Sequence, residues 1–133
     1  MCKVGDIILV KNYTKDGQTM KKHSFIVLSD ESGEIKGLSY DMICNVMSSF
    51  KDEKQKIRKL KYPGNFPITH DDTNILNGNQ QDGFVKTEQL YYFNKNKLDY
   101  MVIGEVKDDI FNLILDFIED ELNVEMVNIV DNL

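Results

Sequence analysis

The chain has 133 residues, of which 41% are apolar and 10% aromatic, so it can form one packed core and is too short for two ordinary domains. No apolar run approaches the roughly 20 residues of a membrane-spanning helix. Two cysteines, Cys2 and Cys44, without a CxxC spacing exclude a disulfide scaffold and a zinc-finger pattern. The opening MCKVGDIILV reads as a strand rather than as a signal peptide. We therefore expect one reduced, cytoplasmic domain spanning residues 1–133.

The net charge of −6 is divided unevenly along the chain. Residues 1–69 hold 12 Lys and Arg against 8 Asp and Glu, a balance of +4, whereas residues 70–133 hold 4 against 14, a balance of −10. This asymmetry predicts one basic working surface on an otherwise acidic body. A solvated charge gradient without any partner fits the same numbers.

The first half of the chain predicts three strands. Residues 5–11 (GDIILVK) and 24–29 (SFIVLS) are short apolar runs typical of buried strands. Between them, residues 12–22 are polar and contain the turn signal Asp16-Gly17. Residues 35–47 predict a third strand, bent near Gly37.

The middle of the chain is polar. Residues 51–61 carry six cations and two anions, and they fit a flexible loop, an exposed strand or a helical turn. Residues 66–68 (FPI) predict an edge strand, since proline cannot donate within a ladder. Residues 70–82 predict a surface loop.

The second half is more regular. Residues 84–86, 89–93 and 100–103 predict strands. A helix is expected to follow, with Asp108 as its N-cap and one apolar stripe of Ile110, Leu113, Ile114, Phe117, Ile118 and Leu122. Residues 123–133 are apolar enough to pack, without a predicted conformation. The result is a mainly β (α+β) chain of about five to seven strands with a C-terminal helix, most simply a small curved sheet or open barrel.

Two groups of residues could act on a phosphodiester. His23 opens a buried strand directly after Lys21-Lys22, where the imidazole could move a proton while the lysines hold a phosphate. The same histidine could simply mark a strand end. Ser48-Ser49 precede the basic segment, where the hydroxyls could donate to a phosphate or begin a turn.

Other motifs add little. One tyrosine of Tyr91-Tyr92-Phe93 could stack on a base, the rest of this strand being core. Neither histidine sits in a ligand-spaced cluster, and there is no phosphate-binding glycine loop, so we expect no metal and no cofactor.

Five segments, in order, resemble the MazF/PemK (Kid-like) family of toxin endoribonucleases. GDIILV is similar to the family's first strand GD(I/V)xxV, KKHSFIVLSD to its second strand xRPxLVxS, and MICNVMSS to its third strand, which ends in Thr or Ser. FVKTEQLYYFNKNKL resembles SxILLEQIRTIDKxRL, and IGEVKDDIFNLILDFI resembles IGxLxxxxxxxVxxAL. The likeness covers residues 4–122.

The resemblance implies an SH3-like barrel with a C-terminal helix, acting as a homodimer and paired with an antitoxin, either protein or RNA. It implies a toxin that cleaves single-stranded RNA without metal, leaves 2′,3′-cyclic phosphate and 5′-hydroxyl ends, and so inhibits translation and growth. His23 falls on the family's catalytic arginine and Ser48 on its catalytic Thr or Ser. The RNA-binding residues would be the basic segment and its neighbours: Lys21, Lys22, Ser49, Lys51, Lys54, Lys56, Arg58, Lys59 and Lys61.

The chain departs from the family pattern in two places. The arginine and following proline are replaced by His23 and Ser24, and residues 70–82 form a longer polar stretch. Arginine would stabilise charge on phosphorus, whereas histidine could transfer the proton itself. The alternatives are a non-catalytic module of the same fold that binds a protein such as gyrase, as CcdB does, and a degenerate phage or mobile-element protein.

Overall fold

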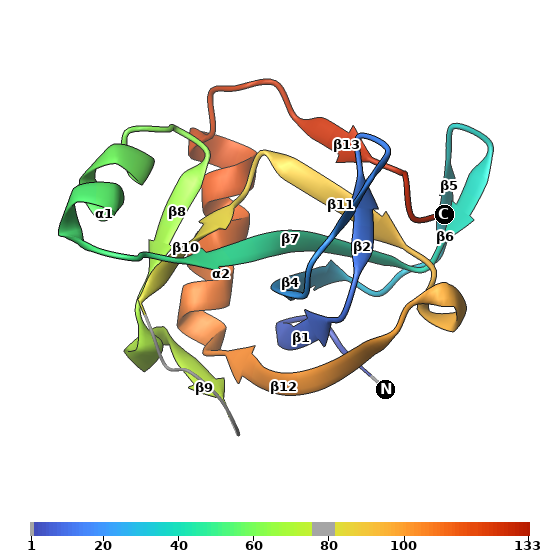
Figure 1. The fold of residues 1–133 in the computed structure, drawn as a ribbon, viewed down its shortest axis with the longest axis horizontal. Helices are drawn as coiled ribbons and strands as arrows, with labels where there is room; N and C mark the ends of the chain where they lie inside the picture. The colour runs from blue at the N-terminus through green and yellow to red at the C-terminus, as the bar shows by residue number, and fades with distance from the viewer. Residues whose placement is uncertain (1, 76–81) are drawn as a thin grey trace.

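The computed structural model describes residues 2–75 and 82–133, and a strongly curved β-sheet dominates it (Figure 1). The strands are β1 (Asp6–Val10), β2 (Tyr13–Lys15), β3 (Gln18–Met20), β4 (His23–Ser29), β5 (Gly33–Ile35), β6 (Leu38–Tyr40), β7 (Met42–Ser49), β8 (Asn65–Ile68), β9 (Thr73–Ile75), β10 (Gly83–Lys86), β11 (Gln89–Phe93), β12 (Tyr100–Val106) and β13 (Val127–Ile129). The helices are α1 (Glu53–Lys59) and α2 (Asp108–Asp116), with short helical turns η1 (His70–Asp72), η2 (Lys95–Lys97) and η3 (Phe117–Glu121).

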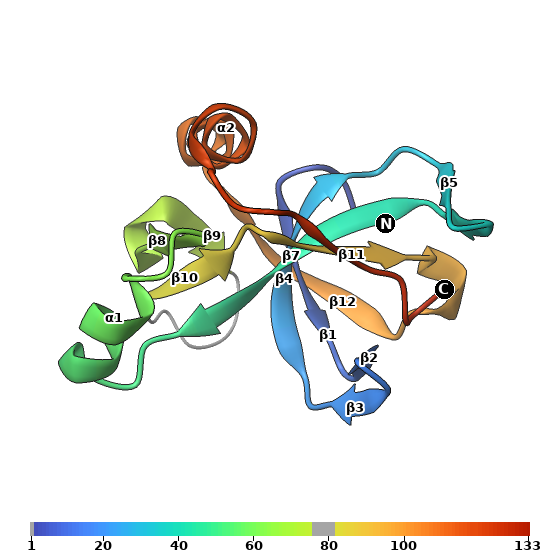
Figure 2. The same ribbon diagram turned by 90° about the horizontal axis from the view of Figure 1, so that it is seen from above.

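The main sheet runs in the order β13-β11-β7-β4-β1-β12-β9. Its longest strand, β7, pairs with β4 on one edge. On the other edge it pairs first with β11 and then, nearer its end, with β10. β10 in turn carries β8. The sheet therefore divides beside β7, and Figure 2 shows β8 and β10 lying on the α1 side of that division, with α2 seen end-on against the sheet.

Apolar side chains pack on both faces of the central strands. Ile8 and Phe25 belong to one cluster, while their neighbours Ile7 and Ile26 belong to a second cluster that α2 covers with Phe111 and Ile114. Alternate strand residues point to opposite faces, so strands buried on both faces need continuous apolar runs. This explains why the first two predicted strands have such runs. The expected mainly β fold, with a curved sheet and a C-terminal helix, is confirmed.

The strand count is higher than expected, because the described residues form thirteen strands, several of only three residues. The predicted third strand is wrong as a single element. Lys36 and Gly37 both have positive φ, at 53° and 78°, and make the two-residue turn of the β5–β6 hairpin; β7 then begins at Met42. Asp16 and Gly17, at 53° and 79°, make the same kind of turn between β2 and β3.

The C-terminal helix also differs in detail. Its N-cap is Lys107 rather than Asp108, whose carboxylate instead lies in the first turn, where it still complements the helix dipole. Leu113 is 53% exposed, because Phe111 and Ile114 take the buried side of the helix. The last turn is a π-turn, in which the Leu122 amide donates to the Phe117 carbonyl.

The predicted edge strand, the predicted surface loop and the C-terminal tail can each be compared with the structure. The predicted edge strand is β8, whose Pro67 pairs opposite Phe84 of β10. The predicted surface loop at 70–82 contains η1 and β9, and its residues 76–81 lie outside the described part of the chain. The tail forms β13, parallel to β11. Within residues 2–75 and 82–133, no helix is long and apolar enough to span a membrane.

Candidate functional site

One open cavity of about 440 Å³ brings together the two predicted catalytic residues and part of the basic set. It lies where β4, β7 and β10 meet the start of the basic segment. Its lining is Leu9, Lys22, His23, Ser24, Met47, Ser48, Ser49, Lys51, Gln55, Lys59, Phe84 and Lys86.

Strand register places His23 and Ser48 beside each other. Ser24 on β4 pairs with Met47 on β7, so the next position in this antiparallel register sets His23 opposite Ser48. Both side chains are half-buried. By alternation they share the sheet face of Phe25 and Val46, at the end where the apolar cluster opens to solvent.

The imidazole of His23 is held through its Nδ1 atom. Nδ1 lies 3.1 Å from the main-chain carbonyl oxygen of Lys21 and 3.4 Å from the hydroxyl of Tyr13. The Tyr13 ring meets the imidazole edge-on, with 5.8 Å between ring centroids. Because a carbonyl oxygen can only accept, the shorter contact favours the neutral tautomer with the proton on Nδ1 and the lone pair on Nε2. No hydrogen bond within the described residues engages Nε2, which is the atom left free to accept a proton.

The basic segment is the helix α1, and a local cap explains where it begins. The Asp52 carboxylate accepts from the Gln55 amide at 2.7 Å, while the Gln55 side chain accepts from the Lys51 amide at 2.7 Å. The helix has no buried residue. Phe50, three residues before the helix, stacks on Phe84 of β10 with 5.2 Å between ring centroids and so ties the start of the basic segment to the sheet.

Lys86 lines the candidate site, and sequence reasoning missed it. It is half-buried on β10. Burial lowers the pKa of its ammonium, and the positive charges of Lys15 and Lys59 lower it further. The uneven charge balance directed the search for RNA-binding cations to the basic first half of the chain, whereas Lys86 belongs to the acidic second half. A lysine directly after the apolar GFV of a predicted strand was the signal that could have found it.

A family model matches residues 3–120 of the chain, and its description is PemK-like, MazF-like toxin of type II toxin-antitoxin system. The chain belongs to this toxin family. Membership confirms the resemblance drawn from the five segments and implies an antitoxin partner. No curated protein matches the chain.

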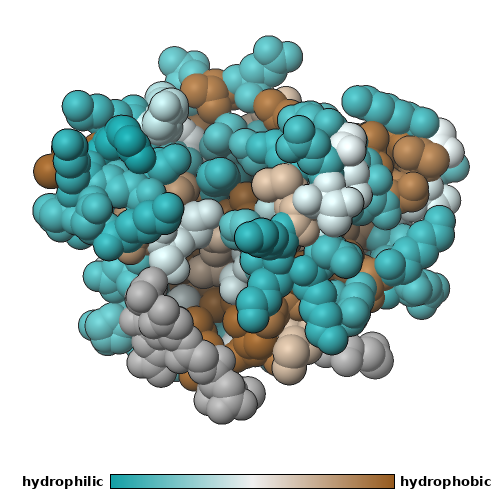
Figure 3. All heavy atoms as spheres, viewed as in Figure 1, coloured by the Kyte–Doolittle hydropathy of each residue, from teal (hydrophilic) through white to brown (hydrophobic). Residues whose placement is uncertain are grey.

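The toxin's other predicted RNA-binding residues lie around the cavity rather than in it. Lys54, Arg58 and Lys61 line a second hollow of about 510 Å³, which Lys51 shares. Figure 3 shows hydrophilic side chains gathered over α1, at the left of the view. Lys56 lies over the Phe50 ring, 5.9 Å from its centroid. Lys21 meets the site through its backbone carbonyl.

The aromatic trio of β11 does not provide a stacking surface. Tyr91, Tyr92 and Phe93 are all buried, at 1%, 8% and 0% exposure. The prediction that one tyrosine is available to a base is therefore wrong. β13 covers the open edge of β11, and Tyr40 packs edge-on against Tyr92.

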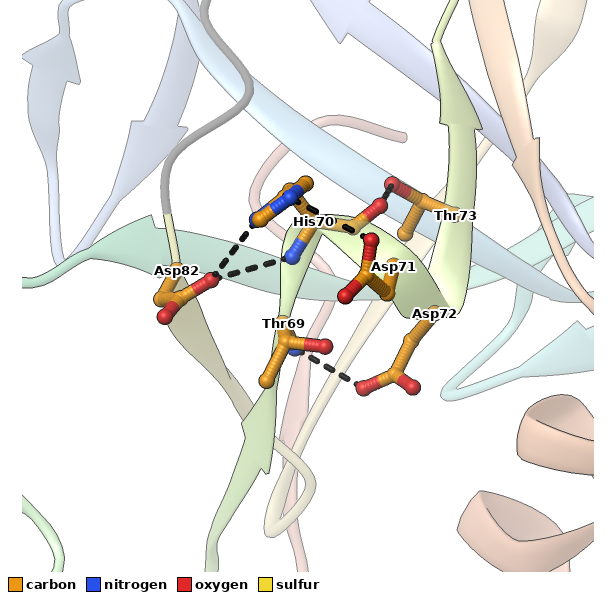
Figure 4. A network of polar contacts seen from close by, with 6 residues as sticks. All are labelled: Thr69, His70, Asp71, Asp72, Thr73 and Asp82. Carbon is orange, nitrogen blue, oxygen red and sulfur yellow. Dashed lines mark hydrogen bonds and ion pairs between the residues drawn. The ribbon is translucent and has the colours of Figure 1, made fainter.

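The toxin's second histidine lies in a separate polar network (Figure 4). The His70 ring sits between two carboxylates, with Nδ1 3.3 Å from Asp82 and Nε2 3.2 Å from Asp71. The Asp82 pKa is lowered by the hydrogen bonds it accepts from the His70 amide and ring. Across the described ranges, no three His, Cys, Asp or Glu residues are grouped so that they could hold a metal ion.

Proposed function

We propose that this toxin is an endoribonuclease that cleaves single-stranded RNA in the cavity holding His23 and Ser48. The observation that carries the proposal is the convergence of a proton-accepting imidazole, a hydroxyl and four cations, Lys22, Lys51, Lys59 and Lys86, on one opening. A cavity lined by this many cations suits an anionic, phosphate-bearing substrate.

The proposed reaction uses the RNA's own 2′-hydroxyl as the nucleophile. Nε2 of His23 takes its proton, O2′ forms a bond to the adjacent phosphorus, and the bond from phosphorus to O5′ breaks. The leaving O5′ takes a proton from the Lys86 ammonium, which its lowered pKa makes a readier donor. The products are a 2′,3′-cyclic phosphate and a 5′-hydroxyl. This route requires no activated water, so we expect it to run in EDTA.

The other residues hold the substrate. The Ser48 hydroxyl donates to a non-bridging phosphate oxygen, and Lys22, Lys51, Lys59 and Ser49 bind it or the neighbouring phosphates. The hollow at Lys54, Arg58 and Lys61 extends this cationic track. Lys56 lies on the same helix, and Lys21 adjoins Lys22 beside His23. The proposed consequence in the cell is cleavage of mRNA, with arrest of translation and growth until the antitoxin binds.

The test is to incubate purified protein with a long RNA in EDTA and to map the ends. His23→Ala should reduce the cleavage rate by about 100-fold or more, the usual contribution of general acid–base catalysis, with RNA affinity nearly unchanged. Ser48→Ala should reduce the cleavage rate by less than His23→Ala does, and Ser48→Thr, which keeps a hydroxyl, should cleave at nearly the wild-type rate. His23→Arg separates the two roles, because arginine cannot accept the proton: retained cleavage in this variant would assign an electrostatic role to the position.

One outcome would replace the proposal. If the wild-type protein does not cleave RNA in EDTA, while His23→Ala still arrests growth when expressed, the toxin acts by binding a protein target instead.

A further inference from the structure

The C-terminal tail lies beyond the residues matched by the family model and is built into the fold. β13 adds to β11 in parallel, with Ile129 opposite Tyr91, and the Ile129 side chain is buried in the same cluster as Tyr13. This anchoring brings Asn132, three residues further on, against the β2–β3 hairpin.

The Asn132 side chain forms hydrogen bonds with both the backbone amide and the backbone carbonyl of one hairpin residue, Thr14. Its Oδ1 accepts from the Thr14 amide at 2.7 Å, and its Nδ2 donates to the Thr14 carbonyl at 3.1 Å. The Thr14 amide and carbonyl do not bond to the main sheet, because β2 and β3 form a separate two-stranded sheet. Three-residue strands of this kind are marginal by themselves and need outside support.

The residues that contact the His23 ring lie close to Thr14 in the hairpin. Tyr13, whose hydroxyl lies 3.4 Å from Nδ1, precedes Thr14 and pairs with Met20 across the hairpin. Lys21, whose carbonyl lies 3.1 Å from Nδ1, follows Met20. Both contacts of Nδ1 therefore come from the base of the hairpin that Asn132 holds.

We propose that Asn132 is a positioning residue for the active site, because it fixes the hairpin that sets the tautomer and orientation of the His23 imidazole. The inference rests on the proposed function for its effect on rate, and on geometry alone for its effect on the ring. When the Lys21 carbonyl is displaced, the Nδ1 proton loses its acceptor and the ring samples the tautomer with the proton on Nε2. In that tautomer Nε2 cannot accept the 2′-hydroxyl proton.

Other contacts between the hairpin and the rest of the protein limit how far Asn132→Ala can displace it. The Lys15 ammonium donates to the Gln89 side chain at 3.4 Å, and Tyr13 is only 5% exposed. The hairpin should therefore stay folded in Asn132→Ala, with its base displaced by a fraction of an ångström. Misplacement on this scale reduces kcat by about tenfold or more.

The test compares Asn132→Ala with Asn132→Asp and with a control in the same tail. The aspartate keeps the acceptor for the Thr14 amide but sets a second carboxylate oxygen against the Thr14 carbonyl, so it should recover only part of the loss. The control is Asn128→Ala, which removes a different tail hydrogen bond, from the Tyr92 hydroxyl at 2.9 Å. It should leave kcat and KM unchanged. Asn132→Ala should lower kcat with little change in KM.

The second readout does not depend on activity. Nitrogen-15 NMR of the ring, in a His70→Gln background so that His23 is the one histidine, reports which nitrogen carries the proton. Wild type and Asn128→Ala should show the Nδ1–H form, and Asn132→Ala should show a mixture.

The two readouts separate the two claims. If wild type does not cleave RNA, the proposed function fails and the ring signals alone decide the positioning role. Ring signals and kcat of Asn132→Ala that match wild type would overturn the inference. So would a loss of kcat in Asn128→Ala as large as that in Asn132→Ala.

Discussion

The side chain of Asn45 donates a hydrogen bond of 2.7 Å to the main-chain carbonyl of Gln89, at the point where the partner of β7 changes from β11 to β10. A second contact, of 3.5 Å, reaches the Thr87 carbonyl. Asn45 has no exposed surface, so these bonds replace the ladder bonds that the division of the sheet removes. This division lets β10 present Lys86 and Phe84 to the candidate site.

Asn45→Ala should destabilise the fold by about 1–3 kcal/mol, because it leaves buried carbonyls without a donor. Urea denaturation measures the change. Asn45→Asp is the matched comparison, since it keeps the shape but turns a donor into a charged acceptor facing carbonyls, and it should be the less stable of the two. An aspartate variant as stable as wild type would contradict this role.

Lys86 should make stability depend on pH in the alkaline range. Its pKa lies below the ordinary 10.5, because burial disfavours the charged form. Between the lowered folded value and the ordinary unfolded value, the unfolded chain binds more protons, so stability rises with pH through that window. Lys86→Met should abolish the rise and be more stable than wild type at neutral pH. Denaturation midpoints at neutral and alkaline pH check this.

The same lysine should set the alkaline limit of cleavage. Loss of its proton removes both a cation and the proposed acid, so the rate should fall at high pH, beginning below the ordinary lysine range. Lys86→Arg keeps its charge at any accessible pH and should remove that fall, at a lower maximal rate. An unchanged profile in Lys86→Arg would exclude Lys86 from the reaction.

RNA binding should depend on salt through α1. Replacing Lys54, Lys56, Arg58 and Lys59 together with Ser should flatten the plot of log affinity against log salt, by about 0.7 for each phosphate of a single strand that the variant no longer neutralises. The control replaces four cations remote from the site, Lys3, Lys95, Lys97 and Lys107. Equal slopes in the two quadruple variants would show that RNA binds elsewhere.

We expect the toxin to form a homodimer through sheet strands or α2, since a domain of this size often buries leftover apolar surface by pairing. Met101 of β12 and Leu113 of α2 are each 53% exposed. Light scattering at tens of micromolar should give twice the chain mass. Met101→Glu or Leu113→Glu should shift it toward the monomer, and a monomeric wild type would contradict the expectation.

The sequence predicted those parts of the structure whose signal is local. The apolar runs around Ile8 and Ile26 marked strands buried on both faces. Asp16-Gly17 marked a turn, but its three-residue strands are polar and were missed, because they extend away from the main sheet. The candidate residues His23 and Ser48 were singled out by their positions next to lysines and to the basic segment, and the family resemblance assigned roles to them. Their adjacency is a consequence of strand register.

The rest depends on contacts between distant residues. Nothing near Asn132 in sequence indicates that it binds Thr14. The exposure of Leu113 follows from how α2 rests on the sheet, which its own periodicity does not fix. Lys86 was overlooked because it lies in the acidic second half of the chain, where the charge balance gives no sign of a basic surface. The fold places it next to lysines of the first half.

The central claim is tested most directly by a single-atom change in the RNA. A substrate with one 2′-deoxy nucleotide on the 5′ side of a mapped cleavage position lacks the proposed nucleophile. In EDTA, wild-type protein should leave that position uncut, and mass spectrometry of the all-ribose control should show a 2′,3′-cyclic phosphate opposite a 5′-hydroxyl. Cleavage of the deoxy substrate at the same position, or a 5′-phosphate end on the product, would contradict the account.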